Sequence, residues 1–522
     1  MSLLKSIATV SGYTAISRVV GFIRDILMAR FLGASMMADA FFVAWRFPNL
    51  FRSLFAEGAL NVAFVPLFTG QLNKNGKKSA LEFAQSVFSF LFYVLLLFTV
   101  LMEIIMPGVI FLLAPGFDKI AGKLELATTL SRISFPFLFF VSLVSLFSGI
   151  LNSIGKFWAA AFTPVLLNLT MIFSLLCLTP FIGGSDAPAY ALAIGVTIAG
   201  IFEFLFLLWH IQKSGFLFPL LSPFKVLGHL SKDVLTLLKK MAPGVLGSGV
   251  YQINLFLDTL FVSFVGAGAI SWLNYAHHVF QLPIGIIGVA VGTALLPVLS
   301  KHVKLGKLKQ ANDHLNRGLE ISLAMSLPAC VGLFMLSVPI IYSLFQYGVF
   351  TSDDTRHTAR ALVIFSLGLP AYMTTKTLSP FFYARGDTTT PVKIAVIGVI
   401  LNSSLALTFM TFWGYAGIAL ATTCSVWINA CQYLFRLIRH PEFSFDKLFR
   451  FRFPRLLFSV LTMGICIHLL LLTQRHFFAE ITQFTQIMTL GGIVFISGTV
   501  YLIMLVLTKG IPLAQLKSII KR

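Results

Sequence analysis

The sequence predicts an all-α, polytopic membrane protein with about fourteen transmembrane helices. Of its 522 residues, 57% are hydrophobic and only 11% are charged, and the mean hydropathy is +0.89. A soluble protein of this size has no core large enough to bury so much apolar surface. The apolar runs approach the roughly 20 residues that cross a bilayer. They also lack the short alternating pattern of a membrane β-barrel, so each is expected to be a helix.

Apolar runs of this length follow one another along the whole chain. The predicted spans are residues 5–32, 36–68, 84–114, 126–152, 158–182, 187–211, 241–265, 271–299, 315–346, 358–385, 391–413, 415–436, 453–473 and 485–508. As helices they satisfy every backbone N–H and C=O group within their own segment. The N-terminal stretch MSLLKSIATVSGY lacks a compact apolar region followed by a small-residue cleavage site, so the first span is expected to be retained.

The basic residues predict the orientation of the spans. They concentrate in the loops after even-numbered spans, at Lys74, Lys77, Lys78, Lys156, Lys301, Lys304, Lys307 and Lys309 and in the segments 213–240 and 436–455. By the positive-inside rule these loops and both termini lie in the cytoplasm. A net charge of +20 can also indicate nucleic-acid binding. Orientation and contact with anionic membrane lipids explain these positions better, so no nucleic-acid partner is expected.

Prolines and glycines indicate an internal repeat. Pro48, Pro107, Pro136 and Gly116 have counterparts at Pro283, Pro339, Pro370 and Gly348, at offsets of 232 to 235 residues. The offset contains six spans, an even number, so both halves have the same orientation. We therefore predict an N-terminal lobe at 1–215 (spans 1 to 6) and a C-terminal lobe at 216–440 (spans 7 to 12) around a central cavity. Spans 13 and 14, at 441–522, are expected to form a groove for a lipid tail.

Seven ionisable residues lie in the stretches 17–25 and 36–58 of the first two spans, in otherwise apolar sequence. They are Arg18, Arg24, Asp25, Asp39, Arg46, Arg52 and Glu57. A charge at the centre of a lipid-facing helix costs about 2.5 to 3.5 kcal/mol, so seven would cost on the order of 20 kcal/mol. A spacing of seven places Arg18 with Asp25, and Asp39 with Arg46, on one helical face, which predicts partial ion pairing. Such residues can also reach the interfaces or form a buried packing network.

The four arginines outnumber the three acids, so pairing leaves a positive excess. A water-filled, cationic cavity explains this excess. A guanidinium stays charged and matches a phosphate with two parallel N–H donors, so the cavity suits a pyrophosphate better than a drug cation. Ala44 is expected to lie beside the cavity, and Leu505 of span 14 is expected to face lipid.

Later spans supply two further candidate sites. Asp258, Asn402 and Thr422, in spans 7, 11 and 12, offer oxygen atoms for a sodium ion. His277 and His278 in span 8 repeat the position of Ala44 to Arg46 and can contact a ligand, change charge with pH or line a pore. The five cysteines all lie in apolar spans and are interpreted as small buried hydrophobes. No P-loop, GxSxG elbow or HExxH motif occurs, so ATP hydrolysis by this chain is not expected.

Several stretches resemble the lipid II flippase family (MurJ, formerly MviN) of the multidrug/oligosaccharidyl-lipid/polysaccharide exporter superfamily. They are SRVVGFIRD at 17–25, ADAFFVAWRFPNLFRSLFAEGALNVAFVP at 38–66, SLFQYGVF at 343–350 and FYARGDTTTPVKIA at 382–395. The resemblance covers essentially the whole chain. It implies a bacterial inner-membrane protein that moves undecaprenyl-pyrophosphate-linked disaccharide-pentapeptide to the periplasmic leaflet by alternating access, without a cofactor.

The resemblance also implies roles for individual residues. The family's functional positions map onto Ser17, Arg18, Arg24, Asp25, Asp39, Arg52 and Glu57, and each residue type is retained here. In span 8 many members have an acidic residue and an arginine where this chain has His277 and His278. The family's sodium site would include Asp258, but its second carboxylate on span 11 is missing. Coupling to sodium or to the membrane potential, and contact with cell-wall synthesis proteins, remain open.

Three rival functions are compatible with parts of the sequence. An exporter of drugs or of another polyprenyl-linked oligosaccharide would share the architecture, but a cation exporter should have cavity carboxylates without an arginine excess. A polytopic glycosyltransferase needs acidic catalytic residues on a substantial outward loop, and the outward loops, such as TSDDT at 351–355, are short. A non-transporting scaffold would leave the arginines inside the spans without a purpose.

Overall fold

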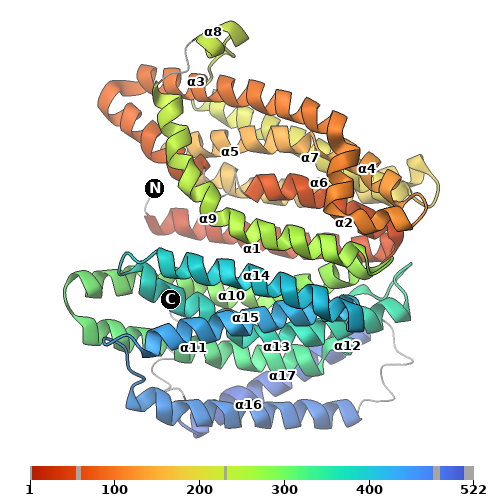
Figure 1. Ribbon diagram of the computed structural model, residues 1–522, viewed down its shortest axis with the longest axis vertical. Coiled ribbons are helices and arrows are strands. Elements are labelled where there is room, and N and C mark those ends of the chain that lie inside the picture. Colours follow the sequence, from red (N-terminus) through yellow and green to blue (C-terminus); the bar gives the residue numbers. More distant parts are fainter. Residues whose placement is uncertain (1–2, 54–59, 229–231, 474–482, 511–522) are drawn as a thin grey trace. The chain divides into compact units, whose positions relative to one another are not determined.

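The structure of the protein is a computed structural model that describes residues 3–53, 60–228, 232–473 and 483–510. Within these ranges the chain forms α-helices and a short 3-10 helix, η2, and no strand (Figure 1). The elements are α1 (Leu3–Leu32), α2 (Met36–Phe51), α3 (Leu60–Leu113), η2 (Pro115–Lys119), α4 (Lys123–Ser134), α5 (Phe137–Ser153), α6 (Phe157–Ile182), α7 (Ala187–Lys213), α8 (Pro223–Gly228), α9 (Lys232–Ser263), α10 (Ala269–Lys304), α11 (Leu308–Met335), α12 (Ser337–Phe345), α13 (Ser352–Tyr383), α14 (Thr389–Trp413), α15 (Tyr415–Ile438), α16 (Lys447–Thr473) and α17 (Gln483–Leu507).

The helices confirm the all-α membrane fold. Ten helical segments among the described residues are long and apolar enough to cross a membrane. The other four predicted spans, 5–32, 36–68, 241–265 and 271–299, fall on α1, on α2 with the start of α3, on α9 and on α10. These four contain most of the candidate functional residues, whose polar side chains lower the apolar content of their helices.

Several predicted span boundaries need correction. The predicted span 126–152 is two helices, α4 and α5, separated at Phe135 and Pro136. Proline has no N–H group to donate to the carbonyl four residues earlier, so a break there is expected. The predicted span 315–346 is likewise divided between α11 and α12 at Leu336. Helix α3 joins the end of the second predicted span to the third through a turn at Gly76, whose φ of 82° favours glycine.

The chain divides into two compact units, Met1–Ser271 and Trp272–Arg522. The predicted boundary between the lobes, at 215/216, lies before the boundary between these two units. The units divide later because α9 packs with the first unit, against α3 and η2. The segment that leads to α8 is fixed on one face of α3. Gln85 Nε2 donates to the Pro219 carbonyl at 2.9 Å, Ser89 Oγ accepts from the Leu221 amide at 3.0 Å, and Tyr93 Oη donates to the Leu221 carbonyl at 2.9 Å.

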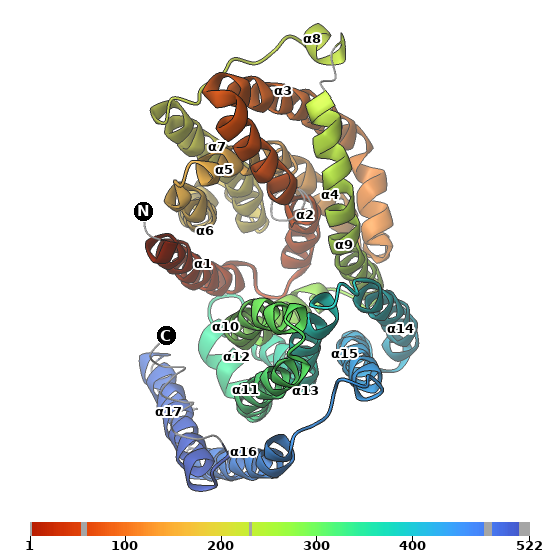
Figure 2. The ribbon, with the colours of Figure 1, turned by 90° about the vertical axis from the view of Figure 1, so that its left-hand side faces the viewer.

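In the second unit, α16 and α17 pack against each other, and α16 also packs along α11 (Figure 2). Leu505 of α17 is only 2% exposed and belongs to the hydrophobic core between these helices. The expectation that Leu505 faces lipid is therefore wrong. Apolar composition alone does not tell which face of a membrane helix meets lipid and which meets another helix, because both faces are apolar.

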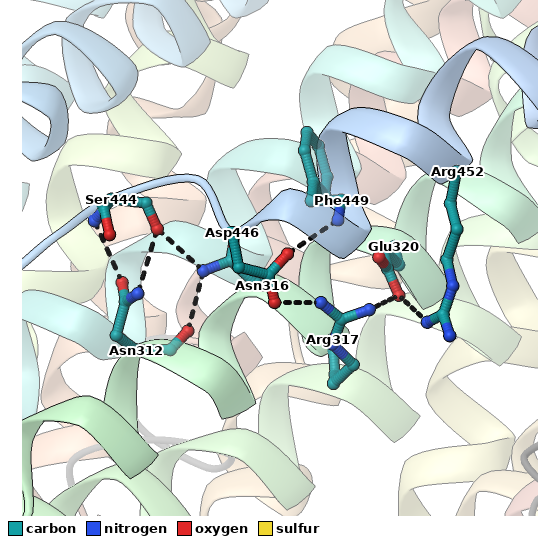
Figure 3. A network of polar contacts seen from close by, with 8 residues as sticks. All are labelled: Asn312, Asn316, Arg317, Glu320, Ser444, Asp446, Phe449 and Arg452. Atoms are coloured by element: carbon teal, nitrogen blue, oxygen red, sulfur yellow. Dashed lines mark hydrogen bonds and ion pairs between the residues drawn. The ribbon is translucent and has the colours of Figure 1, made fainter.

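An ion network connects α11 to the start of α16 (Figure 3). Arg317 pairs with Glu320 and with Asp446, and Arg452 donates to Glu320 Oε2 at 3.0 Å. Asp446 Oδ1 also accepts from the Phe449 amide at 2.6 Å, in the first turn of α16. Glu320 is only 6% exposed, so its carboxylate has lost most of its hydration. Hydrogen bonds from the two guanidinium groups replace the lost hydrogen bonds to water.

Replacing Glu320 with alanine should lower the free energy of unfolding by about 3 kcal/mol, because two arginines lose an acceptor in a largely dry site. Unfolding in detergent with increasing denaturant measures the change. Asp353→Ala is the matched control: Asp353 pairs with Arg356 at 3.4 Å, but both side chains are about three-quarters exposed. Such a pair contributes less than about 1 kcal/mol. Equal losses in the two variants would contradict a stabilising role for the network.

Candidate functional site

Two candidate residues on α1, Ser17 and Arg24, share one face with Gly21 because of their spacing. Ser17, Gly21 and Arg24 follow one another at intervals of four and three, which aligns them along an α-helix. This face packs against α6. The glycine permits a close approach, since a Cβ atom at Gly21 would lie 3.2 Å from Asn168 Nδ2 of α6.

Arg24 is held by two residues. Its Nε and NH2 groups donate to Asp25 Oδ1 at 3.1 and 2.7 Å, and its NH1 group donates to Asn168 Oδ1 at 2.7 Å. The Arg24 side chain is 15% exposed and that of Asp25 is 8% exposed. The sequence predicted Arg18 as the partner of Asp25, whereas the structure shows Arg24 in that role. Arg18 is exposed, although it lies seven residues before Asp25 along the same helix.

Asn168 is a site residue that sequence reasoning missed. Its amide also donates to the Ser17 carbonyl at 3.1 Å and to Ser17 Oγ at 3.4 Å, so it links Ser17 to Arg24. It lies in the apolar run of α6, 144 residues from Arg24 along the chain. A polar residue inside an otherwise apolar span was the available signal, because such residues are costly in lipid and mark functional or helix-bridging positions.

Asp39 occupies a different environment. It is fully buried in the first turn of α2 and pairs with Lys123, also fully buried, at 2.8 Å. Its carboxylate further accepts from the Gly268 amide at 2.7 Å, the Ser271 amide at 2.9 Å and Ser271 Oγ at 2.7 Å. Sequence reasoning expected Arg46 as its partner and did not consider Lys123. These contacts fix the start of α10 to α2.

Arg46 and Arg52 lie farther along α2 and are half-buried. Arg52 Nε donates to Asn49 Oδ1 at 3.0 Å, and Arg52 is the residue that ends the helix. Next to it, Ser53 Oγ accepts from Gln252 Nε2 of α9 at 2.5 Å. Ala44, expected beside a cavity, is fully buried in this structure. Glu57 lies outside the described residues.

Asp39 and Arg52, the first and the last candidate residues on α2, are too far apart to contact one ligand group. Asp39 is in the first turn and Arg52 is the C-cap, so about 20 Å of helix separates them at 1.5 Å per residue. A pyrophosphate is much shorter than this distance. In this structure Asp39 and Arg52 therefore do not contact the same pyrophosphate, although both remain predicted site residues.

The candidates of the second unit lie on α10, α14 and α15. His277 Nε2 is 2.7 Å from Gln281 Nε2, and its ring packs against Phe365 and Phe280. His278 is half-buried on the same helix.

The three residues predicted for sodium fall in different units. Asp258 of α9 belongs to the first unit, where Oδ2 accepts from Asn254 Nδ2 at 3.0 Å. Asn402 of α14 is 2% exposed, and Thr422 Oγ1 of α15 donates to the Ile418 carbonyl at 3.1 Å. Among the described residues, no group of three or more His, Cys, Asp or Glu side chains could hold a metal ion. Carboxylate, amide and hydroxyl oxygens are hard donors of the type that sodium accepts.

Chemically, the Ser17, Arg24, Asp25 and Asn168 cluster can bind an anion. A guanidinium has five N–H donors, and the contacts described use Nε, one NH2 donor and one NH1 donor. One NH2 donor is left for an outside acceptor, and the second NH1 donor contacts only the Met171 sulfur at 3.8 Å, a weak acceptor that a phosphate oxygen can displace. The donors are held in place before a ligand arrives, which lowers the entropy cost of binding.

Relatives of the chain are known along its whole length. A family model described as lipid II flippase MurJ matches residues 28–489. The probable lipid II flippase MurJ of Rhizobium tropici is 38% identical over 524 residues, which cover 100% of this chain and 97% of the relative. The lipid II flippase MurJ of Burkholderia cenocepacia is 37% identical over 434 residues, covering 83% of this chain and 82% of the relative.

Solved structures agree with these relatives. A lipid II flippase MurJ in an inward closed conformation matches with a TM-score of 0.78 and 31% identity, over 95% of this chain and 97% of that one. An inward-facing multidrug resistance MATE family transporter of the MOP superfamily matches with a TM-score of 0.67 over 82% of this chain and 98% of that one. At 16% identity the second match shows a shared fold alone. The family inferred from the sequence motifs is thus confirmed, and the chain belongs to the MurJ family of lipid II flippases, which are membrane transporters.

Proposed function

We propose that this protein moves lipid II, the undecaprenyl-pyrophosphate-linked disaccharide-pentapeptide, from the cytoplasmic to the periplasmic leaflet by alternating access. Family membership supports the substrate class. The observation that carries the proposal is Arg24, a partly exposed guanidinium held inside a membrane span, with one NH2 donor left for a ligand and one NH1 donor that contacts only the Met171 sulfur. A pyrophosphate is the part of lipid II that such a group recognises.

The site favours this substrate over a drug cation, even though MATE transporters share the fold. Arg18, Arg24, Arg46 and Arg52 leave an excess of positive charge on α1 and α2. An excess of arginine repels a cationic drug and attracts an anionic headgroup. The lipid tail stays in the bilayer during transport, with α16 and α17 proposed as its groove.

The proposed location is the bacterial inner membrane, with both termini in the cytoplasm, as the basic loops predict. Membrane lipids surround the protein there, and cell-wall synthesis proteins that consume lipid II outside are proposed partners.

The decisive experiment depletes the protein from cells and measures which leaflet holds the lipid-linked precursor. The precursor should accumulate on the cytoplasmic side and return to the outer leaflet when the protein is resupplied. An unchanged distribution, together with resistance to toxic cations that depends on the protein, would instead identify a drug exporter.

The empty carrier must return to its starting state, and we propose that the membrane potential or a sodium gradient drives this step. A potential supplies about 2.3 kcal/mol per charge per 100 mV. For sodium, Asp258, Asn402 and Thr422 are the proposed oxygen donors. Transport is measured in vesicles with either a membrane potential or a sodium gradient imposed. If sodium drives the step, Asp258→Asn should abolish the stimulation by the sodium gradient and leave any stimulation by the potential unchanged.

His278 is proposed to donate a hydrogen bond to the headgroup. His278→Arg should then preserve or raise the transport rate and reduce its dependence on pH, whereas His278→Ala should lower the rate. If a positive charge at this position is what binds the headgroup, a decline of the wild-type rate between roughly pH 6 and 8 should disappear in His278→Arg. Flipping measured in vesicles over this range tests the proposal. Identical pH profiles for all three proteins would show that His278 only lines the transport path.

A further inference from the structure

We propose that Asn168 of α6 is a positioning residue that presents Arg24 to the anionic headgroup. The inference rests on the proposed function, in which Arg24 contacts pyrophosphate. Asn168 Oδ1 accepts from Arg24 NH1 at 2.7 Å, while Asn168 Nδ2 donates to the Ser17 carbonyl at 3.1 Å and to Ser17 Oγ at 3.4 Å. One side chain therefore fixes the guanidinium against the backbone of its own helix.

Burial makes this arrangement rigid. Asn168 is only 7% exposed. Burying an amide costs free energy unless both its oxygen and its NH2 group form hydrogen bonds. Here both ends are used. The contact also depends on Gly21, because a Cβ atom there would stand 3.2 Å from Asn168 Nδ2 and 3.6 Å from Oδ1. A side chain at position 21 would therefore press on Asn168.

The neutrality of Asn168 suits a site for an anion. Arg24 already pairs with the Asp25 carboxylate, whose charge offsets that of the guanidinium. A second carboxylate at position 168 could also accept from Arg24, but it would lose the hydrogen bond donated to the Ser17 carbonyl and would make the formal charge of the three groups −1. An amide supplies the same acceptor oxygen without this charge, so Arg24 is oriented while its attraction for phosphate is preserved.

Geometry accounts for the direction in which Arg24 is held. Asp25 takes the Nε edge of the guanidinium and Asn168 takes one NH1 donor. Without Asn168 the long arginine side chain regains rotamers, and binding must then order it again. Ordering a side chain of this kind costs roughly 0.5 to 1.5 kcal/mol. The lost hydrogen bond to a charged group adds to that cost.

The test is a double-mutant cycle on the full-length protein in detergent, with undecaprenyl pyrophosphate as the ligand and native mass spectrometry as the readout. Asn168→Ala should weaken binding by about 10-fold, and Asn168→Asp, which keeps the shape but adds a charge, should weaken it more. In the Arg24→Ala background Asn168→Ala should not weaken binding further, because the group that Asn168 positions is gone.

Thr197→Val is the matched control, since it removes another hydrogen bond from a side chain to the backbone of a neighbouring helix, Thr197 Oγ1 to the Ile133 carbonyl at 2.5 Å. It should leave ligand binding unchanged. Thermal unfolding of each variant separates loss of binding from loss of fold, and Asn168→Asp carries the test if Asn168→Ala does not fold.

Two failures are distinguishable. If Arg24→Ala binds the ligand as the wild type does, the anion site itself is wrong and this inference falls with it. If Arg24→Ala binds more weakly but the Asn168 variants bind as the wild type does, the anion site stands and only the positioning role of Asn168 is overturned. The same holds if Asn168→Ala weakens binding by the same factor with Arg24 present and with Arg24→Ala.

Discussion

Arg24→Ala and Arg52→Ala are each expected to abolish transport while the protein still folds and inserts into the membrane. Each removes a guanidinium that can donate two parallel hydrogen bonds to a phosphate. A hydrogen bond to a charged group contributes about 1.5 to 3 kcal/mol, so losing two weakens binding of the headgroup by roughly 100-fold or more. Complementation of a strain depleted of the native protein measures function, and membrane yield measures insertion.

Lysine at these positions should restore only part of the activity, because an ammonium supplies the charge without the planar fork. At position 24 the ammonium would also have to replace contacts to both Asp25 and Asn168. Arg356→Ala is the matched control, since Arg356 is 76% exposed and its pair with Asp353 is on the surface. Full complementation by Arg24→Ala and Arg52→Ala would exclude an anion site on α1 and α2.

The sequence was sufficient for the fold class and the family because those depend on local signals. Apolar runs of span length and the motifs near Ser17 and Arg52 can each be read within a short window. Local spacing also placed Ser17 and Arg24 on one face of α1.

The partners of these residues could not be found in the same way. Asn168 lies 144 residues from Arg24, and Lys123 lies 84 residues from Asp39, so only tertiary packing brings them together. Periodicity within one helix suggested Arg46 for Asp39, because it contains no information about neighbouring helices. For Asp25 it suggested Arg18, whereas the partner is the adjacent Arg24 of the same helix.

One of the stretches that resemble the family, at 382–395, forms a turn between two helices. In FYARGDTTTPVKIA, Gly386 has a φ of 77° between α13 and α14, and Asp387 Oδ1 accepts from the Thr390 amide at 2.9 Å at the start of α14. These hydrogen bonds from Thr390 hold the pKa of Asp387 below its ordinary value. Arg385 Nε donates to Glu442 at 2.9 Å, which ties the turn to the segment before α16. In this structure the contacts described for these residues connect helices of the second unit.

Replacing Asp39 with alanine is expected to be the most destabilising change in the first unit. It would leave the Lys123 ammonium fully buried, with the Phe117 ring at 4.2 Å as a remaining cation–π contact. Breaking a buried ion pair by removing one partner costs about 3 to 5 kcal/mol. Three more donors, the amides of Gly268 and Ser271 and the Ser271 hydroxyl, would lose their acceptor as well.

The partners of Asp39 predict an order of stability. Lys123→Met should cost less than Asp39→Ala, because the carboxylate keeps its three other donors and no cation is left buried. Asp39→Asn should fall between them, since an amide oxygen still accepts hydrogen bonds but no longer neutralises Lys123. Unfolding with denaturant in detergent measures each free energy. Equal stability of all the variants would show that the ion pair contributes nothing to the fold.

The double variant Asp39→Asn with Lys123→Met then decides whether Asp39 also acts on the substrate. Removing both charges leaves no unpaired ion, so the double variant should recover much of the stability that Asp39→Asn loses alone. If the carboxylate serves only to hold α2, Lys123 and the start of α10 together, transport should recover in parallel with stability. If Asp39 contacts lipid II at another stage of the transport cycle, the double variant should be stable but inactive. Complementation and unfolding free energy are compared across the wild type, Asp39→Asn, Lys123→Met and the double variant. Recovery of transport in the double variant would remove Asp39 from the predicted substrate site.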